Sequence, residues 1–160
     1  MILMLGRLFI LAMVGLVILS AGMRVRHEGV EPISHSLTND ECSACHLAYP
    51  AAMLSSASWN ELMISLESHF GEDASLDDES VSAITRYLTS NAADSEWTGN
   101  RFSRGQISDW PIRITETDYW LREHKNQTFT DPTNSEPINQ SDCAACHEGA
   151  ARGDFHVHDA

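Results

Sequence analysis

The sequence predicts a mainly α-helical protein with two small domains, each organised around its own cysteine motif. First, the pattern C-x-x-C-H occurs twice, at residues 42–46 and again 101 positions later at residues 143–147, and these two copies contain all four cysteines of the chain. Second, apolar residues recur at spacings of three and four after the first copy, which is typical of helices with one buried face. Third, the stretch before the second copy is polar and rich in turn-forming residues, including Gly99, Gly105, Pro111, Pro132 and Pro137.

The first 22 residues have the features of a secretory signal peptide. Arg7 is their only charge, residues 8–19 are apolar, and small residues follow up to Gly22. The alternative is an uncleaved membrane anchor, because with residues 1–5 the apolar run approaches the ~20 residues that span a bilayer. Arg24 and Arg26 directly follow the run, which is unusual just beyond a cleavage site. We favour cleavage near Gly22, and both interpretations export the rest of the chain.

Residues 27–91 are predicted to form the first domain, in which a helix carrying the motif is followed by two amphipathic helices. Ser58-Trp59-Asn60-Glu61 reads as a capping box that begins the first of these. Gly71 is placed to end it. The side chains expected on its buried face are Trp59, Leu62, Met63, Leu66, His69 and Phe70.

The next helix of this domain is expected to begin within residues 75–78. This segment combines a capping serine with Asp77 and Asp78, whose charges favour the positive end of the helix dipole. The predicted buried stripe is Val81, Ile84, Tyr87 and Leu88.

Residues 92–160 are predicted to form a second, loop-rich domain. Its one clear helix signal is the cap at residues 115–118, followed by Trp120, Leu121 and His124 on one side. Segments of 65 and 69 residues are small for an independent apolar core. Each domain therefore needs something besides its own side chains to fill its interior.

A haem bound at each cysteine motif would fill the interior of each domain, because C-x-x-C-H is the attachment signal of c-type haem. Each thiol forms a thioether with a haem vinyl group, and the adjoining imidazole binds the iron. The alternatives are a zinc site, a redox dithiol and a disulfide. A shared zinc ribbon has a spacer of roughly 15–20 residues, whereas 97 residues separate Cys45 from Cys143. None of these alternatives needs the histidine found directly after both copies. The sequence therefore predicts two covalently bound haem c groups, held by Cys42, Cys45, His46, Cys143, Cys146 and His147.

The second axial ligand of each iron decides between electron transfer and ligand chemistry, because a strong ligand closes the iron to small molecules. In the second domain the candidates are His124, His156, His158, a more remote group or no ligand at all, since the last methionine of the chain is Met63. His156 and His158 lie in the C-terminal tail, and chain termini are commonly too poorly ordered to hold a ligand in a fixed position. His124 follows an amphipathic helix and is the favoured ligand, with an exposed or purely structural His124 as the alternative.

In the first domain we weigh His69 against two methionines and two other histidines. Met53 is only seven residues after His46, which is short for reaching the opposite face of the ring. Met63 shares the helical face of His69, but core packing is the commoner fate of such a methionine. His69 precedes a chain turn and is favoured; Met63, His35 and His27 stay open. Two imidazoles on each iron predict lower potentials than methionine ligation.

The charge balance bears on partners. Without Arg7, nine Lys and Arg residues face 23 Asp and Glu residues, a formal charge of −14. Such a field repels nucleic acid and membrane surfaces, and it attracts a positively charged partner. Acidity that only keeps the protein soluble accounts for it almost as well. We expect no nucleic-acid role, and membrane contact only through an uncleaved N-terminal segment.

Residues along nearly the whole exported chain resemble the small dihaem cytochromes c (DHC), a family described as partners of the oxygen-binding sphaeroides haem protein. The resemblance is carried by residues 41–46, 48–50, 58–59, 69–74, 87–88 and 113–117, by Trp120, His124 and Ala150, and by residues 143–147 and 153–155. It implies a first domain like a short class I cytochrome c and a second domain of largely irregular fold stabilised by its haem. It also implies bis-histidine ligation of both irons, with His69 and His124 as the sixth ligands.

Together, the motifs and the resemblance predict that the protein is a periplasmic dihaem electron carrier and not an enzyme. The expected donor is a membrane quinol-linked cytochrome of b type, and the expected acceptor is a soluble haem protein. The alternative is a haem enzyme or a ligand sensor with one open or displaceable axial position. Such an enzyme would need a distal acid or base, for which the sequence offers only His156 or His158.

Overall fold

The computed structural model describes residues 29–95, 102–103, 109–131 and 133–156. The N-terminal segment 1–22, His27 and His158 lie outside the described residues. Within them the chain forms helices and loops and no named strand, so the prediction of a mainly α fold is confirmed. None of the described helices has the length and apolar character needed to cross a membrane. The α-helices are α2 (Ser36–Cys42), α3 (Ser56–Ile64), α4 (Asp78–Ser90) and α5 (Asp118–Glu123), and the short 3-10 helices are η1 (Ala51–Met53), η2 (Leu66–Ser68), η3 (Ile114–Glu116), η4 (Cys143–Ala145) and η5 (Ala150–Arg152).

Helix α3 begins earlier and ends sooner than the sequence pattern predicts. Its N-cap is Ser55, whose hydroxyl oxygen accepts from the Ser58 amide, so Ser58 is inside the first turn. It ends at Ile64, because the Ser65 hydroxyl donates to the Glu61 carbonyl and the backbone tightens into η2. The chain then reverses through Phe70 (φ 54°) and Gly71 (φ 109°). His69 therefore projects from a turn rather than from the end of a continuous helix.

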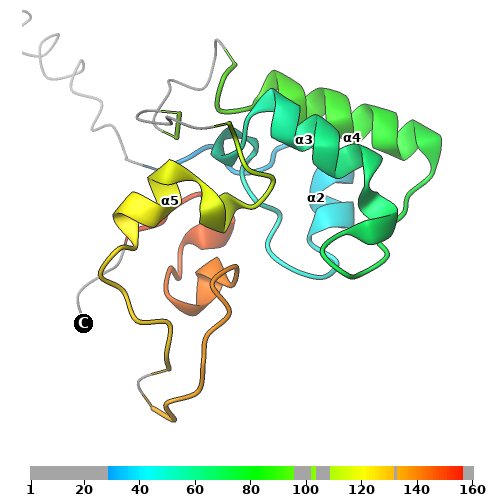
Figure 1. Ribbon diagram of the computed structural model, residues 1–160. Helices are drawn as coiled ribbons and strands as arrows, with labels where there is room; N and C mark the ends of the chain where they lie inside the picture. Colours follow the sequence, from blue (N-terminus) through cyan, green and yellow to red (C-terminus); the bar gives the residue numbers. More distant parts are fainter. Residues whose placement is uncertain (1–28, 96–101, 104–108, 132, 157–160) are drawn as a thin grey trace, which may run out of the picture.

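Helix α4 begins where the sequence indicates, but its cap is Asp77 rather than the predicted serine, and Val81 and Tyr87 of the predicted stripe are only half-buried. The Asp77 side chain caps it by accepting from the amides of Glu79 and Ser80. Ile84 and Leu88 are buried on the side that faces α3. The two helices lie side by side, with α2 beneath them (Figure 1).

The main hydrophobic cluster lies among these helices. Trp59 anchors it, with its indole Nε1 donating to the Ala51 carbonyl at 2.7 Å. Ile112 and Ile114 of the second half pack against the cluster. Its buried members are Ala51, Leu54, Trp59, Leu62, Met63, Ile84, Leu88 and Ala92.

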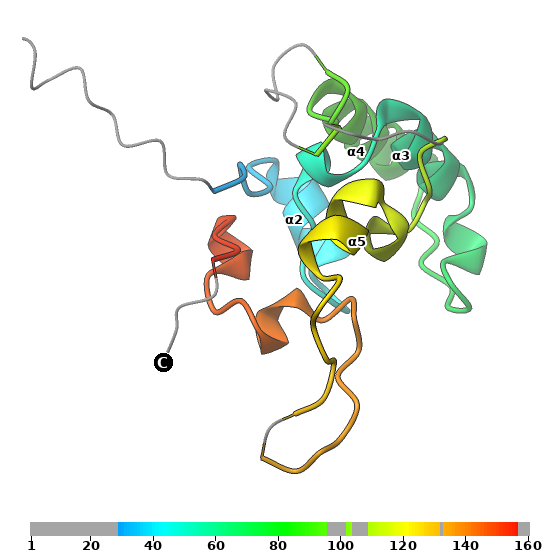
Figure 2. The ribbon, with the colours of Figure 1, turned by 60° about the vertical axis from the view of Figure 1, so that its left-hand side comes forward.

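The second half is loop-rich around one short helix. Helix α5 follows η3 directly, and after α5 a long loop with an isolated bridge between Thr130 and Pro137 projects away from the rest (Figures 1 and 2). The predicted face of α5 is wrong at Leu121, which is 50% exposed. With six residues the helix is too short for its apolar pattern to continue over a second turn.

A second cluster joins the two halves. Buried Val30, Ala52 and Met53 meet Tyr49, Phe102, Ile114 and Phe155 there. Hydrophobic contacts therefore cross the predicted boundary between residues 91 and 92, and the division into 27–91 and 92–160 stays a prediction.

Thr117 holds the turn that begins α5. It is 2% exposed, its hydroxyl donates to the Ile114 carbonyl at 2.8 Å, and the same oxygen accepts from the Trp120 amide at 3.2 Å. Thr117→Val keeps the shape and removes both bonds, so we expect a loss of about 1–2 kcal/mol in the free energy of unfolding. Thr117→Ser keeps the hydroxyl and is the matched control. Denaturant titration of both variants measures the difference; equal stability of the two would contradict the assigned cap.

Candidate haem sites

The two C-x-x-C-H copies place their cysteines alike, although the backbone differs. Cys42 is the last residue of α2, and Cys143 is the first residue of η4. In each copy the first cysteine is half-buried and the second, Cys45 or Cys146, is exposed. No disulfide joins any of the four. Each motif thus has one cysteine packed partly against the protein and one at the surface.

The half-buried thiols are held in their neutral form. Burial raises the pKa of Cys42, and the Glu41 carboxylate adds to the effect. Burial likewise raises the pKa of Cys143 to about 11, with a contribution from Asp142. Both cysteines therefore carry protonated thiols at neutral pH before they form thioethers.

The first motif histidine faces a second imidazole. The ring centroids of His46 and His69 are 6.1 Å apart, and the rings are close to parallel, at 19°. His46 Nδ1 lies 2.7 Å from the Leu47 carbonyl, so it carries the proton and donates. Within the described structure, the buried Nδ1 of His69 has no hydrogen-bond partner. Burial lowers the pKa of His69, and His46 and Arg113 lower it further, which keeps the imidazole neutral as metal ligation requires.

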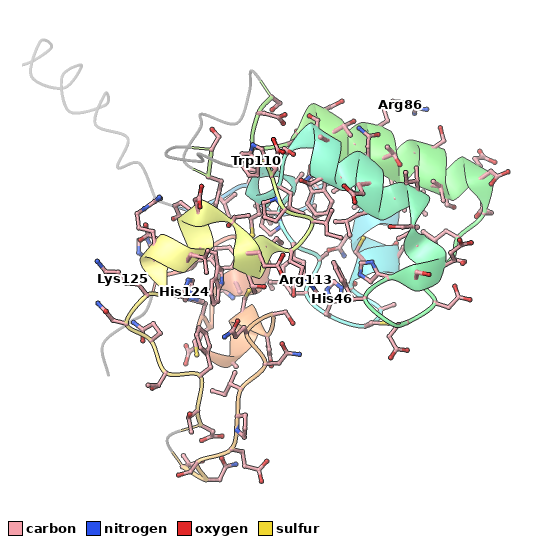
Figure 3. The ribbon with its side chains drawn as sticks, viewed as in Figure 1. His46, Arg86, Trp110, Arg113, His124 and Lys125 are labelled. Atoms are coloured by element: carbon pink, nitrogen blue, oxygen red, sulfur yellow. The ribbon has the colours of Figure 1, made fainter. Side chains whose placement is uncertain are left out.

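The second motif histidine is paired in the same way. His124 and His147 have ring centroids 6.1 Å apart, with the rings nearly perpendicular, at 87°. His124 Nδ1 lies 2.9 Å from the Trp120 carbonyl, and the Trp120 ring stacks on the imidazole at 4.4 Å. Figure 3 shows His124 just beyond the end of α5.

His147 is enclosed by the C-terminal segment. Its ring meets Phe155 edge-on at 5.7 Å. Its buried Nδ1 has no hydrogen-bond partner among the described residues. Burial lowers the pKa of His147, with His124 acting in the same direction. This imidazole is therefore also neutral.

The equal spacing of the two pairs fits an iron between the rings. With a metal–nitrogen bond of about 2 Å on each side, two imidazoles on opposite faces of one metal have centroids about 6 Å apart. In His46 and His124 the proton is on Nδ1, which donates to a backbone carbonyl. Nε2 is therefore unprotonated, and its lone pair can bind a metal. The residues present thus fit a haem at each motif.

The other candidate ligands of the first site are occupied elsewhere. Met53 and Met63 are each 6% exposed and belong to the two hydrophobic clusters. His35 bonds Thr38 through Nδ1 at 2.8 Å and stacks on Tyr87.

At the second site, the His156 side chain is exposed. A zinc site finds no support in the part of the chain that the structure describes, because no three His, Cys, Asp or Glu side chains converge there.

Two residues beside the first pair had no predicted role. The Tyr49 ring stacks on His46 at 4.9 Å. Arg113, from the second half, lies 4.0 Å from the ring centroid of Phe70, next to His69 (Figure 3). Periodicity cannot identify either one, because Tyr49 lies in the loop after the motif and the contact of Arg113 depends on how the halves pack.

Comparison with known proteins gives the family. Residues 38–155 match the family model described as dihaem cytochrome c. A solved diheme cytochrome c from Rhodobacter sphaeroides is 46% identical, with a TM-score of 0.68, over 78% of this chain and 99% of that one. A diheme cytochrome type c from Shewanella baltica is 31% identical, with a TM-score of 0.60, over 76% of this chain and 86% of that one. A comparison with curated proteins gave no match. The chain belongs to the dihaem cytochrome c family and carries two covalently bound haem c groups.

Proposed function

We propose that this dihaem cytochrome c is a periplasmic carrier of single electrons between a membrane quinol-linked donor of the cytochrome b type and a soluble haem-protein acceptor. Membership of the family implies electron transfer. The observation that carries the finer proposal is the second imidazole 6.1 Å from each motif histidine. An iron with two strong axial ligands cannot bind small molecules, so electron transfer is the chemistry that remains to it.

The residues divide the work as follows. Cys42, Cys45, Cys143 and Cys146 would tether the rings. His46 and His69 would hold the first iron, and His147 and His124 would hold the second. Each haem supplies one Fe(III)/Fe(II) couple and so holds one electron.

Hydrogen bonding at the imidazoles favours a low potential. The Leu47 and Trp120 carbonyls accept from the Nδ1 atoms of His46 and His124. Such a bond makes the ligating nitrogen more basic and stabilises the oxidised iron. The absence of a thioether ligand acts in the same direction.

The charge distribution supports a cationic partner at the first half. Residues 29–95 contain Arg86 as their one basic side chain against eleven Asp and Glu residues. Residues 109–156 have four basic side chains against nine acidic ones. The first half is therefore more negative than the second, and its field would steer a positively charged surface toward it.

The ferrous spectrum with and without carbon monoxide tests this function. Two closed irons predict a low-spin spectrum that carbon monoxide leaves unchanged in both haems. A high-spin haem that binds carbon monoxide would sink the carrier proposal and favour an enzyme or a sensor with one open position. The purified full-length protein is sufficient for the measurement.

A further inference from the structure

One side chain links the two haem-attachment segments. The Tyr49 ring stacks on His46 with an interplanar angle of 26°. Its phenolic hydroxyl donates to the Ser141 carbonyl, 92 residues further along the chain, at 2.6 Å. Ser141 is two residues before Cys143. Tyr49 thus contacts the axial histidine of one site and the attachment loop of the other.

The acceptor of this bond is held rigidly. The Asn139 side-chain oxygen accepts from both the amide (3.1 Å) and the hydroxyl (2.9 Å) of Ser141. The Asn139 carbonyl accepts from the Asp142 amide at 2.8 Å. The Ser141 carbonyl also accepts from the Cys143 amide at 3.0 Å. The position of Cys143 is therefore tied directly to the oxygen that Tyr49 holds.

The ring of Tyr49 is fixed as well. Its neighbours Ala48 and Pro50 are buried, and the ring packs against both hydrophobic clusters. A half-buried aromatic ring held on both sides loses little conformational entropy when its hydroxyl forms one further bond. The contact with Ser141 is thus a built junction between the halves.

We infer that Tyr49 is the positioning residue for electron exchange between the two haems: it holds the His46 side of the first haem against the Cys143 loop of the second. The inference rests on the proposed carrier function. The exchange moves one electron from a ferrous to a ferric haem, while Tyr49 keeps its proton and its electrons. The ring, the hydrogen bond and the short backbone segment to Cys143 also form a continuous contact path between the sites.

Tyr87 provides a matched control. Its ring also stacks on an imidazole, that of His35, at 5.2 Å and 21°. Its hydroxyl oxygen accepts from the Ser34 amide at 2.9 Å. Tyr87→Phe therefore removes one tyrosine hydroxyl beside a histidine, as Tyr49→Phe does, but all its partners lie in the first half.

The test uses the holoprotein and two measurements. The rate of electron exchange is read from haem-methyl exchange in NMR spectra of the half-reduced protein. Hydrogen exchange reports the protection of the amides of Cys143, Cys146 and His147. Tyr49→Phe is expected to slow electron exchange severalfold and to speed hydrogen exchange of these amides about fivefold, the effect of losing one hydrogen bond. Both haems should stay low-spin.

The controls separate positioning from general destabilisation. Tyr87→Phe is expected to leave both measurements unchanged. Asn139→Ala frees the acceptor loop without touching Tyr49, and it should change both in the same direction as Tyr49→Phe. An unchanged rate in Tyr49→Phe, or equal slowing in Tyr87→Phe, overturns the inference. Carbon monoxide binding by the wild-type protein reports separately on the carrier function.

Discussion

His69→Ala is expected to open the first haem alone. Without that imidazole the iron keeps His46 and no second ligand among the described residues, because Met53, Met63 and His35 are held in other contacts. One of the two haems should then become high-spin and bind carbon monoxide, while the other keeps its spectrum. The ferrous difference spectrum of the holoprotein measures this directly.

His124→Ala should give the complementary result at the second haem. His147 has no methionine in its half of the chain to replace the lost ligand. His35→Ala is the matched control, because it removes an imidazole that bonds Thr38 and stacks on Tyr87. It should leave both spectra low-spin. If His69→Ala or His124→Ala leaves a fully low-spin, carbon monoxide-insensitive protein, that histidine is removed from the ligand set.

The attachment of two haem groups could be predicted from the sequence because its signal is local, whereas the sixth ligands stay a prediction. The spacing within each motif is set by covalent attachment, and the absence of methionine beyond Met63 leaves histidines for the second iron. The structure then brings His69 to His46 and His124 to His147, the same pairs that residue order and the family resemblance indicated.

Helix boundaries were predictable where a capping side chain fixes them. The caps are Asp77 for α4 and Thr117 for α5, each inside the segment that its pattern marks, although the α4 pattern pointed to the serine of that segment. The end of α3 was not predictable. Apolar residues keep the helical spacing through Leu66, but the helix ends at Ile64, where the Ser65 hydroxyl donates to the Glu61 carbonyl. Periodicity shows which side chains are buried and does not show whether the backbone between them is α-helical or 3-10.

The contacts between the halves could not be predicted at all. Tyr49 meets Ser141 across 92 residues, and Arg113 meets Phe70 from the other half. No local pattern encodes either pair. They arise because the second half packs over the first haem site, on both its His46 side and its His69 side.

Gly153→Ala should break the contact between Val30, near the N-terminus of the described chain, and the segment beside the second haem site. The Val30 amide donates to the Gly153 carbonyl at 2.8 Å. A Cβ at residue 153 would collide with the Val30 carbonyl oxygen, and the backbone there has φ 75°. We expect Gly153→Ala to lower the free energy of unfolding by about 3 kcal/mol or more, since the colliding atom is backbone and cannot rotate away.

Gly71→Ala is the control that has the backbone strain of a positive φ without a steric collision. Gly71 also has a positive φ, 109°, but nothing lies within 4 Å of a Cβ built there. Its substitution should therefore cost only the strain of the backbone, roughly 1–3 kcal/mol. Denaturant titration of the two holoproteins gives the comparison. Because Phe155 packs on His147 two residues beyond Gly153, Gly153→Ala should also perturb the spectrum of the second haem before that of the first. A Gly153→Ala protein as stable as Gly71→Ala, with both spectra intact, would mean that Val30 and Gly153 are not in contact.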